Sequence, residues 1–212
     1  MPGSLPNPIR LFRIVHKANI PHLLRYGIVY REHFLADPDY IHIGDLKLIE
    51  NRHNHPVRVV PPGGSLGEYV PFYFGPLSPM LLRIRNGTGV VQRPQEDIVY
   101  ICCNLTTVLE NCAIWCFTDG HAKKSISTFY NKLEDLDKVD WDMVKQKWWH
   151  NTEEDTDRER RKQAEFLVYD RVPVNCISGL IVYNEATAED LRRVVEEANL
   201  AIPVVVRPSF YY

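Results

Sequence analysis

Glu165 is the residue whose position is most unusual for a side chain that could carry chemistry. It interrupts the start of an apolar run, 164–168, that is typical of a buried strand and follows a strongly charged segment at 153–162. A carboxylate held there could accept a hydrogen bond from a sugar hydroxyl and stabilise an oxocarbenium-like centre, as glycosidic cleavage requires. Pattern alone favours the plainer alternative, in which Glu165 faces solvent from a half-exposed strand.

Two arginines and two histidines are further candidates. A guanidinium makes forked contacts with anions, so Arg13 and Arg52 could hold a pyrophosphate or a substrate base. His16, at the end of an expected strand, and His121, at the start of an expected helix, could orient a base or a ribose. Most arginines are simply solvated and a lone histidine is more often structural, so none of the four defines a site by itself.

Aromatic side chains are dense at 69–74, where Tyr69, Phe72, Tyr73 and Phe74 occur. Such rings could stack on bases or on the ring of a cofactor. Because strand residues alternate between two faces, only part of this set can face a ligand, and the rest belong to the core.

Standard motifs for phosphate and metal binding are missing from the sequence. It contains neither G-x-x-x-x-G-K-[ST] nor G-x-G-x-x-G, and neither G-x-S-x-G nor H-E-x-x-H. Cys112 and Cys116 have a C-x₃-C spacing, but no second ligand pair follows, so we expect buried free thiols and no metal. Five cysteines, an odd number, do not indicate a disulfide framework. An active site in this chain must therefore be dispersed.

The elements that position these side chains follow from periodicity and turn residues. Strands are expected at 11–15, 69–74, 80–84, 98–103, 113–117, 164–168 and 204–207. Helices are expected between Asn19 and Gly27, at 122–133, from a cap at Asp140 through Trp149, and from a capping box at Thr187 to about Ala198. The polar, poorly periodic stretch 30–62, which contains Arg52, is typical of a binding loop. Short strands mixed with short helices predict an α+β fold.

Composition limits the class of protein. With 212 residues, 45% hydrophobic and 25% charged, the chain fits one globular domain spanning 1–212. It has no apolar run long enough to span a membrane and no secretory pattern at its start, which favours the cytoplasm. The net charge of −2 means that any nucleic-acid site must be a local basic groove.

The order of short motifs along the chain resembles the DarT family of DNA ADP-ribosyltransferases. Arg13-Ile-Val-His16 with its following helix is similar to the family's Y-x-I-T-H segment, and Ile49-Glu-Asn-Arg52 to its arginine-bearing loop. Similar runs follow as P-P-G-G at 61–64, Y-V-P-F-Y-F at 69–74, S-P-M at 78–80, F-T-D-G-H-A at 117–122 and R-K-Q-A-E-F-L-V at 161–168. Together these motifs cover nearly the whole chain in the family's order.

The resemblance implies a fold and a set of site residues. The fold is an ADP-ribosyltransferase fold, a split mixed or antiparallel β-sandwich with peripheral helices. NAD⁺ is the implied co-substrate, without a metal, and the residues implied to bind it are Phe12, Arg13, Ile14, His16, Arg52 and Tyr73. The family's catalytic residues fall on Glu165 and Arg52, and His121 with Arg52 would contact the target base of the DNA. The family often carries histidine where this chain has Arg13.

The implied reaction transfers ADP-ribose to thymidine in single-stranded DNA and releases nicotinamide. The resemblance assigns removal of the thymine ring proton to Arg52. Because a guanidinium is normally charged, we hypothesise that Arg52 chiefly stabilises the developing base anion while the proton passes to a neighbour or to water. The family further implies a monomeric toxin that blocks replication and is countered by the macrodomain antitoxin DarG.

Two alternatives stay open at this point. The chain could be an enzyme of the same fold that modifies guanosine, RNA or protein. It could also be a non-catalytic nucleic-acid-binding domain, in which case Glu165 would carry no activity.

Overall fold

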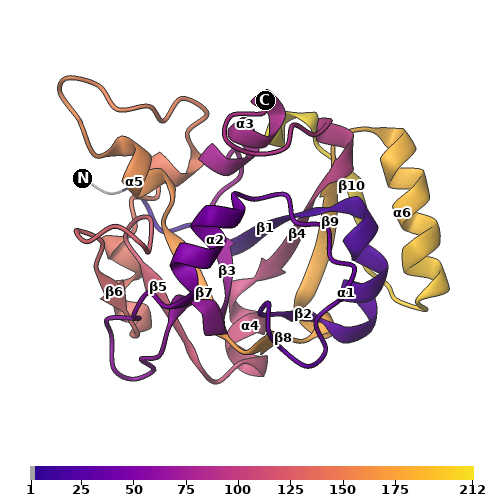
Figure 1. Cartoon of the computed structure of the whole chain (residues 1–212), viewed down its shortest axis with the longest axis horizontal. Coiled ribbons are helices and arrows are strands. Elements are labelled where there is room, and N and C mark those ends of the chain that lie inside the picture. Colours follow the sequence, from indigo (N-terminus) through magenta and orange to yellow (C-terminus); the bar gives the residue numbers. More distant parts are fainter. Residues whose placement is uncertain (1–2) are drawn as a thin grey trace.

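The structure, a computed structural model, describes residues 3–212 and is built on one mixed sheet of eight strands (Figure 1). In chain order these strands are β1 Arg10–His16, β3 Tyr69–Tyr73, β4 Ile98–Asn104, β5 Trp115–Thr118, β6 Phe129–Tyr130, β7 Glu165–Tyr169, β9 Ile177–Val182 and β10 Val204–Val206. Their order across the sheet is β10-β9-β4-β1-β3-β7-β5-β6. Among the strand pairs formed within residues 3–212, only β9–β10 is parallel. The short strands β2 Ile28–Val29 and β8 Arg171–Val172 form a separate two-stranded sheet.

The large sheet is divided near its middle, between β1 and β3. Along its other edge β1 pairs with β4 over all seven of its residues. Towards β3 it pairs at a single position, where Phe12 lies opposite Tyr73. Past this pair, alternate backbone groups on the β3-facing edge of β1 have no ladder partner, and unpaired strand edges readily accept a ligand's hydrogen bonds.

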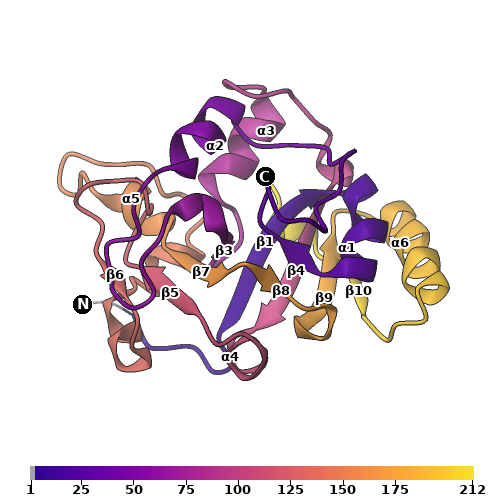
Figure 2. The same cartoon turned by 60° about the horizontal axis from the view of Figure 1, so that its bottom comes forward.

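In the described part of the chain, six α-helices surround the sheet: α1 Ile20–Tyr26, α2 Leu46–His53, α3 Pro79–Asn86, α4 Leu105–Asn111, α5 Arg158–Lys162 and α6 Glu185–Glu197. Helices α1 and α6 pack together beside the β9–β10 end of the sheet (Figures 1 and 2). Helix α6 contributes Ala188, Leu191 and Val195 to the main core. Helix α2 has no buried residue and lies over the middle of the sheet, where its last turn carries Arg52 (Figure 1).

Alternation along β1 divides its side chains between two hydrophobic clusters. Leu11 and Val15 belong to the larger core cluster. Phe12 belongs to a second cluster, against which Ile14 also packs, on the opposite face of the strand. The first strand is therefore covered on both faces, which explains why its sequence reads as an almost continuous apolar run.

Most expected strands and two expected helices are confirmed. Strands lie at or within two residues of 11–15, 69–74, 98–103, 113–117, 164–168 and 204–207. Helix α1 follows Asn19 and ends at Gly27, whose φ of 82° suits glycine. Helix α6 also exists, but Asn184 rather than Thr187 caps it, because the Asn184 side chain accepts a hydrogen bond from the Thr187 N–H.

Three expected elements are wrong. Residues 80–84 form part of helix α3 rather than a strand, because Ser78 caps the helix through the Leu81 N–H and Pro79 occupies its first turn. Residues 122–133 form turns and strand β6 rather than a helix. The segment from Asp140 to Trp149 forms only a short 3₁₀ turn at Met143–Lys145.

The stretch 30–62 is mostly irregular, as expected, but it also contains helix α2, which the sequence analysis missed. Asp45 caps this helix by accepting a hydrogen bond from the Leu48 N–H. All five cysteines are buried and free, as expected. Within residues 3–212, no helix is both long enough and apolar enough to cross a membrane.

Candidate active site

Glu165 and Arg52, which are 113 residues apart in sequence, form a forked ion pair. Arg52 Nη1 donates to Glu165 Oε1 at 3.0 Å, and Nη2 donates to Oε2 at 2.8 Å. Glu165 is only 3% exposed, so the expectation that it could instead face solvent is wrong. A charge this deeply buried requires a partner, and the bidentate geometry is the strongest that a guanidinium offers to a carboxylate.

The central strands fix the position of Glu165. Glu165 begins β7 and lies opposite Tyr73 of β3, which in turn lies opposite Phe12 of β1. The Glu165 N–H donates to Thr118 Oγ1 at 3.2 Å, and that hydroxyl donates to the Gly120 carbonyl at 2.6 Å. The glutamate therefore stands where the two halves of the sheet meet, on backbone that three strands and a buried threonine hold in place.

Opposing effects set the ionisation of this pair. Burial alone would raise the pKa of Glu165, but the Arg52 charge and the hydrogen bonds from His121 and Arg52 outweigh burial and hold the pKa well below its usual range. Burial likewise acts to lower the pKa of Arg52, and Glu165 reverses this effect and raises it. Both side chains are therefore charged at neutral pH, and a guanidinium in this state cannot act as a proton acceptor.

His121 and the segment after it complete the surroundings of Glu165. The Ala122 N–H donates to Glu165 Oε1 at 3.0 Å, and His121 Nδ1 lies 3.4 Å from the same oxygen. The Lys123 N–H approaches that Nδ1 atom to 3.3 Å, so one nitrogen faces both a carboxylate and a donor. The charge-assisted contact is the stronger of the two, which favours a proton on Nδ1 and leaves the lone pair on Nε2.

An arginine that the sequence analysis did not single out holds this segment in place. The Arg160 guanidinium donates to Asp119 at 2.9 Å, to Ser127 Oγ at 3.3 Å and to both carboxylate oxygens of Asp157 at 2.7 Å. Its backbone carbonyl also accepts a hydrogen bond from the His121 N–H at 2.9 Å. The signal available in sequence was the run of charged residues before Glu165, which reads as a solvated surface until its partners are known.

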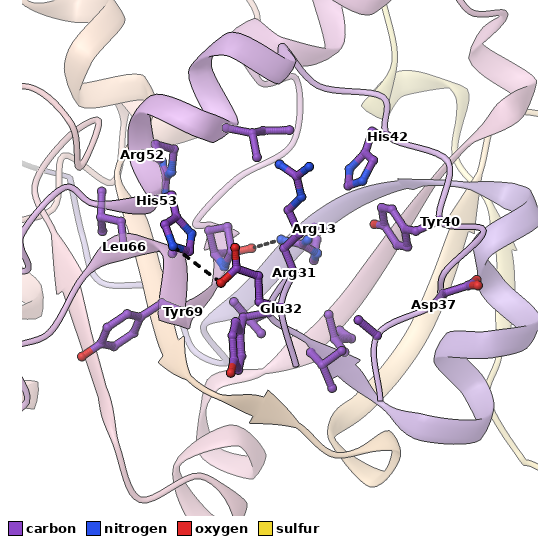
Figure 3. A pocket seen from close by; sticks show the side chains of 18 of the residues that line it. Arg13, Arg31, Glu32, Asp37, Tyr40, His42, Arg52, His53, Leu66 and Tyr69 are labelled. Atoms are coloured by element: carbon purple, nitrogen blue, oxygen red, sulfur yellow. Dashed lines mark hydrogen bonds and ion pairs between the residues drawn. The ribbon is translucent and has the colours of Figure 1, made fainter. Parts of the chain in front are cut away.

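A cavity of about 510 Å³ opens between α1, α2 and the middle of the sheet, and 22 residues line it. Figure 3 shows Arg52, His53 and Tyr69 on one side, Tyr40 and His42 on the other, and Arg13 and Arg31 between them. This volume lies within the range of small-molecule and cofactor sites. Arg52 lines the cavity and separates it from Glu165, which does not.

Arg13 is the expected NAD⁺-binding residue that most directly faces this cavity. Its Nη1 donates to the Pro71 carbonyl at 3.0 Å, across the gap between β1 and β3. Its Nε is buried and has no hydrogen-bond partner within residues 3–212, so any contact from this guanidinium to a ligand falls to its terminal nitrogens. Burial and the charges of Arg31 and Arg13 lower the pKa of His42, which favours its neutral form.

The other residues expected to bind NAD⁺ occupy different positions. Phe12 packs edge-to-face with Tyr100 and Phe210, and Ile14 packs against the same cluster. His16 is buried, and its Nδ1 accepts a hydrogen bond from the Ala18 N–H at 3.1 Å. None of the three side chains lines the cavity.

Tyr73 lies among the charged groups of the site. Burial, followed by the Glu165 charge, raises the pKa of its hydroxyl to about 12, against the opposing charges of Arg52, Arg13 and Arg83. The hydroxyl is therefore neutral at physiological pH and can donate a hydrogen bond. Within the described part of the chain, no cluster of three or more His, Cys, Asp or Glu residues is placed to hold a metal ion.

Solved structures share both the fold and this arrangement of the chain. Thermus sp. 2.9 DarT in complex with ADP-ribosylated ssDNA superposes with a TM-score of 0.91 at 30% identity, over 100% of both chains. The same protein in complex with NAD⁺ gives a TM-score of 0.84 at 30% identity, over 99% of this chain and 100% of that one. By fold, the protein is an ADP-ribosyltransferase.

Sequence comparison identifies the family within this class. A family model described as "ssDNA thymidine ADP-ribosyltransferase, DarT" matches residues 12–212. A DNA ADP-ribosyl transferase of Escherichia coli O127:H6 is 35% identical over 208 residues, which is 98% of this chain and 95% of that protein. The chain belongs to the DarT family.

A third relative has a different domain composition. A DNA ADP-ribosyl transferase-DNA ADP-ribosyl glycohydrolase fusion protein of Thermosipho africanus is 29% identical over 206 residues. The match covers 95% of this chain and 49% of the fusion protein.

Proposed function

We propose that this chain transfers ADP-ribose from NAD⁺ to thymidine in single-stranded DNA, with NAD⁺ bound in the 510 Å³ cavity and Glu165 acting on its ribose. The forked Arg52–Glu165 pair at the wall of this cavity is the observation that carries this proposal. Glu165 Oε1 is surrounded by Arg52, Ala122 and His121, whereas Oε2 accepts one hydrogen bond, from Arg52 Nη2. A carboxylate oxygen can accept two, so Oε2 is the atom available to a ribose 2′-hydroxyl.

Transfer proceeds by exchange at the anomeric carbon of the ribose. The bond from that carbon to nicotinamide breaks, and its electron pair leaves with the nicotinamide nitrogen. Positive charge develops on the sugar, and the ionised Glu165 stabilises it through the 2′-hydroxyl. The thymine ring nitrogen then forms the new bond and loses its proton. Because burial keeps water away from Glu165, the charge interaction is stronger than it would be in solvent.

Arg52 stabilises the thymine base and does not accept its proton. It lies between the cavity and Glu165, so the ribose reaches Oε2 only when the guanidinium has moved aside. A displaced Arg52 carries its full charge to the target thymine, where it stabilises the base anion that forms as the proton leaves. This role suits a group that stays protonated throughout.

His121 is placed to accept that proton. Its Nδ1 faces Glu165, which orients the ring as a carboxylate orients histidine in other acid–base pairs. Its Nε2 makes no hydrogen bond to any residue between 3 and 212, so its lone pair is available to a ligand. His121 thus serves as the neighbour that takes the thymine proton and also contacts the target base.

NAD⁺ contacts are divided between side chains and backbone. Arg13 lines the cavity, and its guanidinium suits the pyrophosphate. Phe12 and Ile14 turn their side chains into the core, so they contact the ligand through their backbone groups. Phe12 is the residue paired with Tyr73, and Ile14 lies on the part of the β1 edge beyond that pair. A carboxamide, which has a carbonyl acceptor and an NH₂ donor group, can pair with such backbone groups. His16 supports the end of this strand, and Tyr73, opposite Glu165 in the sheet, offers a neutral hydroxyl that can donate a hydrogen bond to the ligand.

Incubation with labelled NAD⁺ and two oligonucleotides, one containing a single thymidine and one containing none, tests the reaction. We expect label only on the first, and mass spectrometry of the digest should identify a modified thymidine. Glu165→Gln should lower the transfer rate roughly a thousand-fold while NAD⁺ still binds, and Glu153→Gln, an exposed glutamate, is the matched control. Label on protein, RNA or guanosine alone, or an active Glu165→Gln variant, would contradict the proposal.

We also propose the cellular setting that this chemistry requires. A single domain spanning 1–212, acting as a monomer in the cytoplasm, would modify the host's own DNA and act as a toxin that blocks replication. A macrodomain antitoxin that removes the mark, DarG, is the expected partner. The Thermosipho relative, in which a DNA ADP-ribosyl glycohydrolase is fused to the transferase, supports this pairing. Co-expression that restores growth of cells producing the chain tests it.

A further inference from the structure

Two basic side chains lie together outside the NAD⁺ cavity, on loops that flank the active site. Arg58 follows helix α2, and Lys123 follows His121. Arg58 Nη1 donates to the Ser125 carbonyl at 2.9 Å, which ties the 55–60 segment to the 121–127 segment. In both cartoons the loop after α2 runs beside the chain that leads into β6 (Figures 1 and 2).

These side chains lack a counter-charge. Among the ion pairs formed within residues 3–212, neither Arg58 nor Lys123 takes part, although Arg160 and Arg161 nearby are paired with aspartates. His55, at the start of the 55–60 segment, has a buried Nε2 that makes no hydrogen bond within the same described range. Burial and the charges of Arg58, Lys123, Arg52 and His121 lower the pKa of His55. Two unpaired cations beside a neutral histidine favour an anion.

This basic pair is separate from the dinucleotide site. The cavity lining includes Arg52, His53 and Asn54, and then no residue until Leu66. Neither Arg58 nor Lys123 is part of it, and the cavity contains its own cations in Arg13 and Arg31. The NAD⁺ pyrophosphate therefore has binding partners elsewhere, which leaves this pair for the second substrate.

We propose that Arg58 and Lys123 bind a backbone phosphate of the single strand, next to the nucleotide whose base reacts. The proposal rests on the proposed function, since it assumes that a single strand enters beside Arg52 and His121. A phosphodiester offers two anionic oxygens to a guanidinium and an ammonium held on neighbouring loops. Phosphate contacts fix the register of a strand without reading its sequence, so this pair positions the target base over the ribose.

Fluorescence anisotropy with a thymidine-containing oligonucleotide tests the subsite by binding rather than by turnover. Lys123→Gln and Arg58→Gln should each weaken DNA binding roughly five-fold at moderate salt, as expected for one exposed charge pair. Each should also reduce the slope of log affinity against log salt by about 0.7. Lys124→Gln, the adjacent exposed lysine, is the matched control and should leave both quantities unchanged. NAD⁺ affinity should be the same in all variants.

Oligonucleotides with one neutral methylphosphonate linkage locate the contact. In the wild-type protein, neutralising one linkage beside the target thymidine should weaken binding by the same roughly five-fold factor. With Lys123→Gln, that linkage should have little further effect, because the two changes remove one interaction. Equal losses in wild type and variant at every linkage, or a fall in NAD⁺ affinity instead of DNA affinity, would overturn the proposal. Failure of transfer in an otherwise binding-competent wild type would instead count against the proposed function.

Discussion

Replacing Arg52 with methionine tests how the active-site glutamate is kept ionised. Methionine fills part of the volume of the arginine stem but removes the charge and both hydrogen bonds to Glu165. Glu165 would then be a carboxylate that is 3% exposed, with only the Ala122 N–H and His121 beside it. Breaking a buried ion pair from one side costs about 3–5 kcal/mol, so we expect a loss of this size at pH 7.

The pH dependence of this loss is the more demanding part of the prediction. In the wild type, Glu165 has a pKa below its ordinary 4.5, so its contribution to stability is present above pH 4.5 and is lost on acidification. In Arg52→Met, burial dominates and should raise the pKa of Glu165 above 4.5. The contribution of Glu165 to stability is then fully present below pH 4.5 and is lost as the pH rises through the raised pKa. The penalty of the substitution should therefore shrink by about 1.4 kcal/mol per pH unit below the raised pKa.

Urea unfolding between pH 4 and 8, followed by tryptophan fluorescence, measures this penalty. The control compares E165Q with the double variant E165Q/R52M, because the side chain at position 165 can then no longer titrate. In that background the penalty of Arg52→Met should be smaller and independent of pH. A penalty that stays constant with pH in the parent background would show that Arg52 stabilises through packing, and the electrostatic reasoning would be refuted.

Three further substitutions probe the scaffold. Burial lowers the pKa of Lys162 to about 7 from 10.5. Between these pH values the folded state therefore binds fewer protons than the unfolded chain, and the free energy of unfolding should rise by about 1 kcal/mol from pH 7.5 to 8.5. Lys162→Met should abolish that rise in urea titrations. Gly75→Ala should lower the thermal midpoint through a loss of roughly 1–3 kcal/mol, because the added Cβ would overlap the Val144 carbonyl oxygen; an unchanged midpoint would contradict the close approach. Ser78→Ala removes the cap of α3, which bonds the Leu81 N–H, and should cost about 1 kcal/mol in chemical denaturation without changing NAD⁺ affinity.

Local patterns predicted the elements whose signals are short-range. The strand at Glu165 was evident from the apolar residues that follow it, and the helix before Gly27 from its stop signal. The order of the motifs also predicted that Glu165 and Arg52 belong to one site, and in the structure the two side chains are in direct contact. Their ionisation could not be predicted, because it depends on burial and on partners 113 residues away in sequence.

The wrong elements failed for physical reasons that act over longer distances. In the segment after Gly120, side-chain bonds to Arg160 and Glu165 hold turns in place of a helix, and such tertiary contacts override helix propensity. In α3 the apolar run at 80–84 fitted a strand, but the cap at Ser78 and the proline after it decided otherwise. The cap at Ser78 and the proline after it can be read in the sequence, whereas the contacts with Arg160 and Glu165 cannot.

The single Phe12–Tyr73 pairing has a mechanical consequence for the enzyme. Each half of the large sheet has its own ladder, and within residues 3–212 this pair is the one position at which the two ladders meet. Glu165 and Tyr73 belong to the half that contains β3 and β7, and Arg13 belongs to the half that contains β1. The Arg13 hydrogen bond to the Pro71 carbonyl connects the two halves across the gap. We therefore expect the width of the opening to depend on the Phe12–Tyr73 pair and on the Arg13–Pro71 hydrogen bond, since both join the two halves beside the cavity.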